Sequence, residues 1–122
     1  MLKFEATGFP SPAADLVGVT LDLNELLINH PAATFFTRVK GSSMVQAGIR
    51  DGDLLIVDRS ISPADNHVVV AMLNSNFTLK RLRKVGSKYF LVTENDRQKK
   101  FEITPEDQFE VWGVVTFVIG RV

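Results

Sequence analysis

The distribution of apolar and polar residues divides the chain into an irregular beginning and a longer, β-rich remainder. Residues 1–21 include the run Thr7-Gly8-Phe9-Pro10-Ser11-Pro12-Ala13-Ala14, whose prolines and glycine disfavour both a regular helix and a central strand. We therefore expect an extended N-terminal arm over residues 1–21 and a single domain over residues 22–122. An extended segment of small residues is also the form in which a protease cleft binds its substrate, by strand-like pairing.

One short helix is expected where the arm ends. Asp22 lies three residues before Glu25, a spacing that resembles a capping box, and Pro31 ends the helical pattern. The apolar face of this helix consists of three leucines: Leu23, Leu26 and Leu27. We interpret His30, which directly precedes Pro31, as a residue that caps the end of the helix.

The rest of the chain predicts a mostly β fold of several strands. Six segments are rich in the residues that strands favour and are separated by turn residues. The predicted strands are Thr34–Lys40, Leu54–Asp58, His67–Leu73, Asn76–Arg83, Lys88–Thr93 and Phe109–Ile119. Asn74-Ser75-Asn76 indicates a tight hairpin, and residues 42–48 indicate one helical turn that Gly48 terminates.

Composition supports one globular domain and gives no electrostatic reason for nucleic-acid binding. The chain has 122 residues, 45% of them hydrophobic, and 14 basic residues balance 14 acidic ones. A DNA-binding protein normally carries an excess of clustered lysine and arginine, so we expect no direct, specific DNA binding. The basic residues between Lys80 and Lys88 are interpreted as a solvated face of a strand.

Several classes of site are excluded by residue usage. The chain has no cysteine, which excludes disulfides, thiolate catalysis and cysteine-based zinc sites. His30 and His67 lack partners at metal-ligand spacing, so neither a metal nor a cofactor is expected. No segment looks like a signal peptide and no apolar run approaches the ~20 residues of a membrane helix, so we expect a cytoplasmic protein without a membrane anchor.

Ser43 and Lys80 are the candidate catalytic residues. A serine hydroxyl is a poor nucleophile until a base takes its proton, and a lysine can be that base if burial lowers its pKa. Ser43 begins the predicted turn, where free backbone N–H groups could stabilise an oxyanion, but a simple capping role for Ser42 or Ser43 explains the local sequence better. Strand alternation puts Lys80 on a face that is not cleanly apolar, so the pattern alone does not establish its burial.

Four motifs in order resemble the LexA/UmuD family of self-cleaving serine–lysine peptidases, and its UmuD-like members most closely. They are Gly8-Phe9-Pro10-Ser11-Pro12, Gly41-Ser42-Ser43-Met44, Gly48-Ile49-Arg50-Asp51-Gly52-Asp53-Leu54-Leu55-Ile56-Val57-Asp58 and Phe77-Thr78-Leu79-Lys80-Arg81-Leu82. The helix segment from Asp22 to Pro31 is similar as well, and the resemblance extends from about Ala6 to Val118.

The resemblance implies a role for each matching residue. Ser43 corresponds to the nucleophile and Lys80 to the general base, the Thr7–Gly8 bond to the self-cleavage site, and the backbone amides of Ser43 and Met44 to the oxyanion donors. It also implies a peptidase domain that forms a homodimer, a RecA–single-stranded-DNA filament that stimulates cleavage, and a UmuC-type polymerase subunit that binds the cleaved form. The expected function is that of an accessory subunit of an error-prone translesion DNA polymerase in the SOS response.

The chain departs from the family at the cleavage site, which keeps other functions open. Thr7 stands where the family usually has alanine or cysteine, and only seven residues precede the bond. A β-branched residue there could slow cleavage, so one alternative is a cleavage-deficient binding module that acts through its arm and dimer surface. A general serine–lysine peptidase related to signal peptidases is the other alternative, weakened by the missing membrane anchor and by the cleavable arm.

Overall fold

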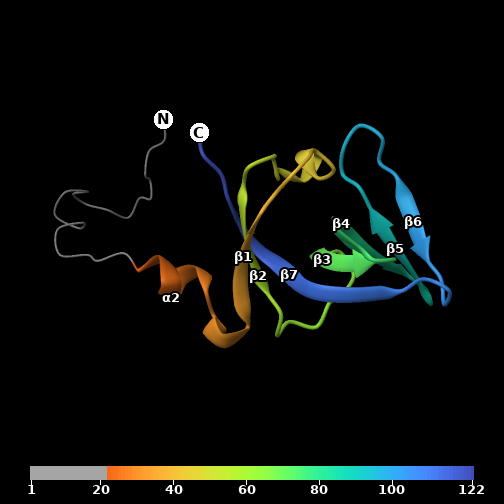
Figure 1. Ribbon diagram of the computed structural model, residues 1–122, viewed down its shortest axis with the longest axis horizontal. Coiled ribbons are helices and arrows are strands. Elements are labelled where there is room, and N and C mark those ends of the chain that lie inside the picture. Colours follow the sequence, from red (N-terminus) through yellow and green to blue (C-terminus); the bar gives the residue numbers. More distant parts are fainter. Residues whose placement is uncertain (1–21) are drawn as a thin grey trace.

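The domain is built around one antiparallel sheet of seven strands (Figure 1). The structure, a computed structural model, describes residues 22–122, so the expected arm lies outside the described residues. The strands are β1 (Thr34–Arg38), β2 (Leu54–Asp58), β3 (Val68–Leu73), β4 (Asn76–Val85), β5 (Lys88–Val92), β6 (Lys100–Ile103) and β7 (Phe109–Ile119). Their order in the sheet is β1-β2-β7-β3-β4-β5-β6, and every pairing is antiparallel. The predicted mostly β fold is confirmed.

The predicted helix is confirmed as α2 (Leu23–Leu27). Asp22 caps its N-terminus, because the carboxylate accepts hydrogen bonds from the backbone N–H groups of Asn24 and Glu25. The cap at the other end is Ile28, and a short 3-10 turn, η1 (Pro31–Ala33), leads into β1. Within residues 22–122 no helix has the length and hydropathy needed to cross a bilayer.

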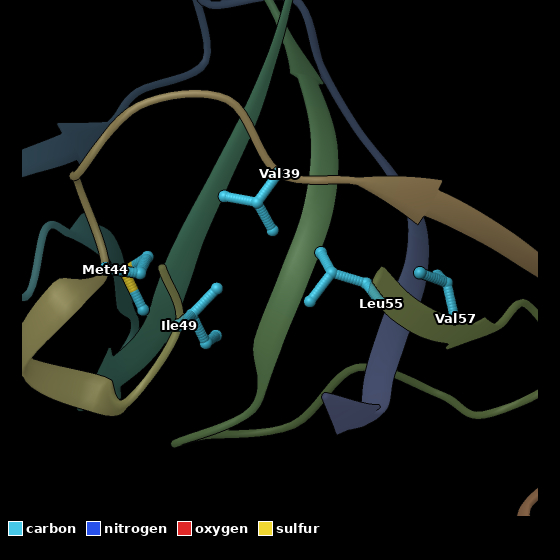
Figure 2. Packing of buried hydrophobic residues seen from close by; sticks show 5 residues of the cluster. All are labelled: Val39, Met44, Ile49, Leu55 and Val57. Atoms are coloured by element: carbon cyan, nitrogen blue, oxygen red, sulfur yellow. The ribbon is translucent and has the colours of Figure 1, made fainter. Parts of the chain in front are cut away.

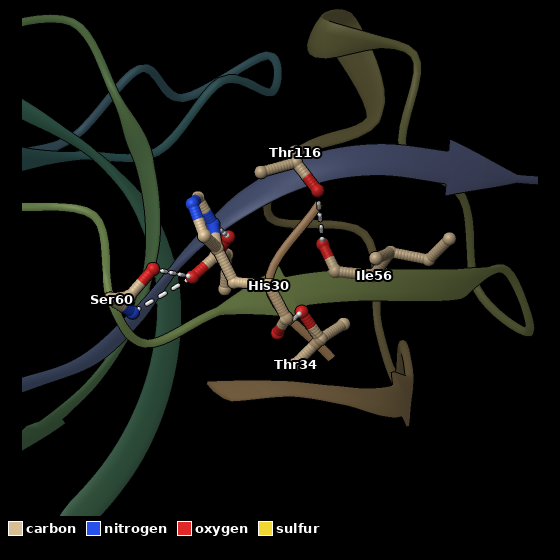
Figure 3. Close-up of polar contacts among 6 residues, drawn as sticks. His30, Thr34, Ile56, Ser60 and Thr116 are labelled. Carbon is tan, nitrogen blue, oxygen red and sulfur yellow. Dashed lines mark hydrogen bonds and ion pairs between the residues drawn. The ribbon is translucent and has the colours of Figure 1, made fainter. Parts of the chain in front are cut away.

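The expectation that His30 caps the helix is wrong. Its imidazole instead reaches the end of β2, where Nδ1 lies 2.6 Å from Oδ2 of the buried Asp58 (Figure 3). The other carboxylate oxygen of Asp58 accepts hydrogen bonds from both the backbone N–H and the hydroxyl of Ser60. The Ser60 hydroxyl, followed by His30, holds the pKa of Asp58 below its ordinary value. This contact fixes the segment between α2 and β1 to the sheet.

The strand boundaries agree closely with the predicted ones, with one strand missed. The β3–β4 hairpin turns at Asn74 and Ser75, which both have positive φ angles of 48° and 73°, as the turn residues predicted. The missed strand, β6, has only four residues, two of them charged, and pairs on one side with β5. Such a short edge strand resembles a polar loop in sequence.

Two apolar clusters form the core. One contains Val39, Met44, Ile49, Leu55 and Val57 (Figure 2). Met44 and Ile49 belong to the connection between β1 and β2, so this connection is packed against the sheet. The second cluster contains Val69, Ala71, Leu82, Leu91 and Val114. The clusters therefore fix both the β1–β2 connection and the central strands, which carry the candidate catalytic residues.

Candidate active site

Ser43 lies in the β1–β2 connection, two residues before the start of a short 3-10 turn, η2 (Val45–Ala47). Gly48 terminates this turn with a φ of +84°, as the sequence predicted. The N-cap position is Met44, and no side chain caps the turn, so the capping interpretation of Ser42 or Ser43 is wrong. The side chain of Met44 is 1% exposed and anchors the turn in the core, which leaves the neighbouring Ser43 half-buried at the surface of the cluster.

The turn that carries Ser43 lies beside a stretch of the edge of β4 that β5 leaves uncovered. β4 pairs with β3 through residues 76–81 but with β5 only through residues 81–85, so residues 76–80 lack a strand on the β5 side. The Ser43 hydroxyl lies 3.4 Å from the carbonyl oxygen of Leu79 and donates to it. Glu94, just beyond β5, donates its N–H to the Ser43 carbonyl and accepts from the N–H of Gln46, each at 2.7 Å. These bonds hold the turn beside the β5–β6 loop, as Figure 1 shows.

Lys80 directly follows Leu79 and is half-buried. Its partner across the sheet is Val69, which is fully buried in the second apolar cluster. This burial lowers the pKa of Lys80, because desolvation disfavours the ammonium form. The ion pairs among residues 22–122 do not include Lys80, so no described carboxylate offsets that effect. Lys80 is therefore the type of lysine that can give up its proton more easily than a solvated one.

The structure places Ser43 against the backbone of β4 beside Lys80. Among the hydrogen bonds of residues 22–122, the Ser43 hydroxyl bonds Leu79 and none joins it to Lys80 Nζ. In the same described part of the chain, the backbone N–H groups of Ser43 and Met44 donate to no acceptor. Two adjacent unpaired N–H groups next to a hydroxyl have the composition of an oxyanion hole.

A groove adjoins this corner of the domain. It has a volume of about 270 Å³ and lies between the end of β1 and the start of β4. Its lining residues include Thr37, Lys40, Leu55, Val70, Phe77 and Leu79. A larger hollow of about 480 Å³ lies near Met72 and Phe109, and neither hollow is lined by Ser43 or Lys80 themselves. Of these two hollows, only the groove is lined by Leu79, whose carbonyl accepts the Ser43 hydroxyl.

The interpretation of the basic residues of β4 and β5 as a solvated face holds for Arg83, Lys84 and Lys88, which are exposed, but not for Lys80 and Arg81, which are half-buried. Three of these five residues pair with carboxylates. Arg81 donates to Glu94 from two guanidinium nitrogens, at 2.9 and 2.7 Å. The other two pairs are Arg83 with Asp65 and Lys88 with Glu102. Glu94 is therefore fixed by Arg81 while its backbone holds the Ser43 turn, a role that its position in a predicted loop did not indicate.

The expected cleavage site and the expectation about metal binding concern residues other than Ser43 and Lys80. Thr7 and Gly8, the residues of the expected cleavage site, lie outside the described residues. From Asp22 to the C-terminus there is no group of three or more His, Asp or Glu side chains placed to hold a metal ion.

Comparison with known proteins identifies the family. Residues 1–116 match the family described as Peptidase S24-like. The chain is 45% identical to Protein ImpA of Salmonella typhimurium over 114 residues, which cover 93% of this chain and 77% of that protein. It is 42% identical to Protein MucA of Escherichia coli over 112 residues (91% and 76%), and 34% identical to the LexA repressor of Bordetella avium over 114 residues (93% and 53%). In agreement with the resemblance found in its serine and lysine motifs, the chain belongs to the Peptidase S24-like family.

Proposed function

We propose that the protein is a self-cleaving serine–lysine endopeptidase that cuts its own Thr7–Gly8 bond. One observation carries this proposal: the Ser43 hydroxyl contacts the β4 residue that precedes Lys80, and burial lowers the pKa of that lysine. A nucleophile, a base with a lowered pKa and two unpaired backbone N–H groups are the parts that acyl transfer requires.

In the first half of the reaction, neutral Lys80 accepts the proton of the Ser43 hydroxyl. The serine oxygen then forms a bond to the carbonyl carbon of Thr7, and the negative charge moves to the carbonyl oxygen. The N–H groups of Ser43 and Met44 stabilise this oxyanion. When the carbon–nitrogen bond breaks, the Lys80 ammonium returns its proton to the leaving amine of Gly8.

In the second half, water hydrolyses the ester that joins Thr7 to Ser43. Lys80, neutral again, takes a proton from the attacking water and gives it to the departing serine oxygen. The products are a peptide of residues 1–7, which ends in a new carboxylate, and a chain of residues 8–122, which begins with a new amine. No cofactor takes part.

The biological role that we propose is the one implied by the resemblance to UmuD-like proteins. The cleaved chain acts as a homodimeric accessory subunit of a UmuC-type translesion polymerase in the cytoplasm during the SOS response. A RecA–single-stranded-DNA filament stimulates the cleavage by favouring the docked position of the arm, which raises the population of the reactive state without new catalytic groups.

The second candidate is a binding module that keeps the fold without cleaving itself. The observation that favours it is the hydrogen bond of the Ser43 hydroxyl to Leu79, which has to break before Lys80 can take the proton. The β-branched Thr7 before the bond points in the same direction, because it replaces a smaller residue of the family.

Mass spectrometry of the purified full chain at alkaline pH separates the two functions. We expect the chain to lose its first seven residues over time, and Ser43→Ala to remain intact with an unchanged fold. Ser42→Ala is the matched control, because this neighbouring serine is exposed and should cleave as the unmodified chain does. An intact wild-type chain at every pH would favour the binding module, and cleavage by Ser43→Ala would assign the nucleophile elsewhere.

A further inference from the structure

Phe77 is an exposed aromatic residue with an ordered aromatic partner. Its side chain is 59% exposed, and its ring meets the ring of Trp112 edge to face, with centroids 5.2 Å apart and an angle of 76°. The guanidinium of Arg59 lies 4.7 Å above the Trp112 ring, and its Nε donates to the Trp112 carbonyl. Trp112 thus contacts both Arg59 and the exposed Phe77. We call Phe77 and Trp112 the aromatic shelf.

Phe77, the exposed member of the aromatic shelf, lines the groove that also contains Leu79, whose carbonyl accepts the Ser43 hydroxyl. Phe77 and Leu79 both line this groove and point to the same face of β4, since side chains alternate along a strand. Their backbone groups also point to the same edge, where the Leu79 carbonyl accepts the Ser43 hydroxyl. The β5 strand does not cover this part of the edge. The backbone of Phe77 can therefore pair with an added strand that reaches Ser43.

An added antiparallel strand brings specific residues together. If the scissile carbonyl of Thr7 lies at Ser43, Thr7 is beside Leu79. Two residues further along the arm, Phe9 is then beside Phe77, because antiparallel partners run in opposite directions with the same rise per residue. Gly8, between them, has no side chain to obstruct the approach. Twelve residues separate Phe9 from Asp22, enough to span about 40 Å when extended.

We propose that the aromatic shelf of Phe77 and Trp112 is a specificity site that receives Phe9 when the arm pairs with the free edge of β4. This assignment rests on the proposed self-cleavage and defines its substrate class: an extended peptide with an aromatic residue two positions after the residue that acylates Ser43. Aromatic side chains opposite one another on neighbouring strands stabilise the pairing, and an exposed phenylalanine against tryptophan provides such a contact. Phe77 acts as a positioning residue for the scissile bond.

The first test measures the rate of self-cleavage at alkaline pH for Phe9→Ala, Phe77→Ala and the double variant. We expect each single change to slow cleavage by about tenfold or more, because the burial of one phenylalanine is lost. The double variant should be no slower than the slower single one, since both changes remove the same contact. Phe101→Ala, an exposed phenylalanine on the distant strand β6, is the matched control and should cleave at the wild-type rate. Phe77→Leu tests whether the fold tolerates a change at this position.

The second test does not depend on cleavage, because Trp112 is the only tryptophan of the chain. In a full chain that carries Ser43→Ala, acrylamide quenching of Trp112 fluorescence reports whether the arm covers the aromatic shelf. We expect Phe9→Ala to increase the quenching and Phe4→Ala, an arm residue before the bond, to leave it unchanged.

The two tests distinguish a failure of the proposed self-cleavage from a failure of the proposed binding of Phe9 to the aromatic shelf. If the wild-type chain does not cleave but Phe9→Ala increases the quenching, the reaction is wrong and the aromatic shelf still binds the arm. If Phe9→Ala leaves the quenching unchanged, or if Phe9→Ala and Phe77→Ala slow cleavage independently of each other, the assignment of Phe9 to the aromatic shelf is overturned.

Discussion

Ser43, in the β1–β2 connection, and Glu94, just beyond β5, are joined by a 2.7 Å hydrogen bond from the N–H of Glu94 to the carbonyl of Ser43. Glu94 is itself fixed by two hydrogen bonds from Arg81. The candidate nucleophile therefore lies on a turn that is attached to the end of β5. Arg81 positions this turn through Glu94, and its neighbour on β4, Lys80, is the proposed base for Ser43. A short connection can position a reactive group in this way only because both its backbone and its core residues are anchored.

Met44 provides the apolar part of this anchor, and its truncation should affect stability and activity together. We expect Met44→Ala to lower the free energy of unfolding by about 2–5 kcal/mol, because a side chain that is 1% exposed leaves a cavity. The rate of self-cleavage should fall by more than the loss of folded protein explains, because the turn that carries Ser43 loses the side chain that anchors it. Chemical denaturation and the cleavage rate, each measured well below the melting temperature, check both effects.

Two variants serve as controls for Met44→Ala: one keeps most of the side-chain volume, and the other changes the neighbouring residue. Met44→Leu keeps most of the volume and should cost less than about 1.5 kcal/mol. Val45→Ala, at an exposed position of the same turn, should leave both quantities near the wild-type values. A Met44→Ala protein that is destabilised but cleaves at the wild-type rate would show that the turn keeps its geometry without this side chain.

Asp58 should make the stability of the domain sensitive to acid. Its pKa is lowered in the folded protein, chiefly by the Ser60 hydroxyl and then by His30, so the folded state favours the carboxylate. Such a group stabilises the fold above the ordinary aspartate pKa of ~3.9, and this contribution is lost as the pH falls through the lowered value. We expect Asp58→Asn to reduce the free energy of unfolding by about 1–3 kcal/mol at neutral pH, because a buried acceptor of three hydrogen bonds is weakened.

Thermal melts from pH 7 to pH 3 test this assignment. The difference in melting temperature between wild type and Asp58→Asn should shrink below about pH 4, where Asp58 of the unfolded wild-type chain takes up a proton while the folded state still favours the carboxylate. Asp65 and Asp107, whose pKa values are also lowered, are present in both proteins and do not contribute to the difference. Asp96→Asn, an exposed position, is the control and should follow the wild type at every pH. A constant difference across the whole range would contradict the role of Asp58.

The sequence predicted most strands of this fold because their side chains and turn residues carry local signals. The Asn74-Ser75 turn needs residues that tolerate positive φ, and long strands such as β7 are rich in β-branched and aromatic residues. β6 escaped prediction because four residues, two of them charged, give no clear period. His30 was misinterpreted because its partner, Asp58, lies 28 residues away and only the paired strands bring them together.

The candidate site, like the contact of His30, depends on residues that are distant in the sequence and that local patterns do not connect. Ser43 and Lys80 could be chosen from their motifs, but the partial burial of Lys80 depends on Val69 across the sheet, which no local pattern reveals. The contact of Ser43 with Leu79 likewise arises because β5 is shorter than β4 and leaves part of the β4 edge uncovered, where the Ser43 hydroxyl reaches the Leu79 carbonyl. Tertiary pairing, rather than composition, creates both the lowered pKa and the free edge.

The residues around the expected cleavage bond should control the rate of self-cleavage. We expect Thr7→Ala to speed the reaction, because a smaller side chain lets the strand approach Ser43 more closely. Gly8→Glu should stop it, since a charged side chain would have to lose its hydration in the groove. The measurement is the rate of mass loss of the full chain at one alkaline pH, with Ser11→Ala as a control further along the arm. Equal rates for Thr7→Ala and Gly8→Glu would mean that this bond is not the substrate.

The pH dependence of self-cleavage should follow the ionisation of Lys80. Only the neutral amine can accept the Ser43 proton, so the rate should rise by about tenfold per pH unit while most of the lysine is charged. Because burial lowers the pKa of Lys80, the rate should level off below the ordinary lysine value of ~10.4. Lys80→Ala should abolish the reaction, and so should Lys80→Arg, because a guanidinium keeps its proton throughout this range. Lys88→Arg, in an exposed ion pair, is the matched control. Rates measured from about pH 6 to pH 10 decide the matter: a flat wild-type profile, or cleavage by Lys80→Arg, would mean that another group is the base.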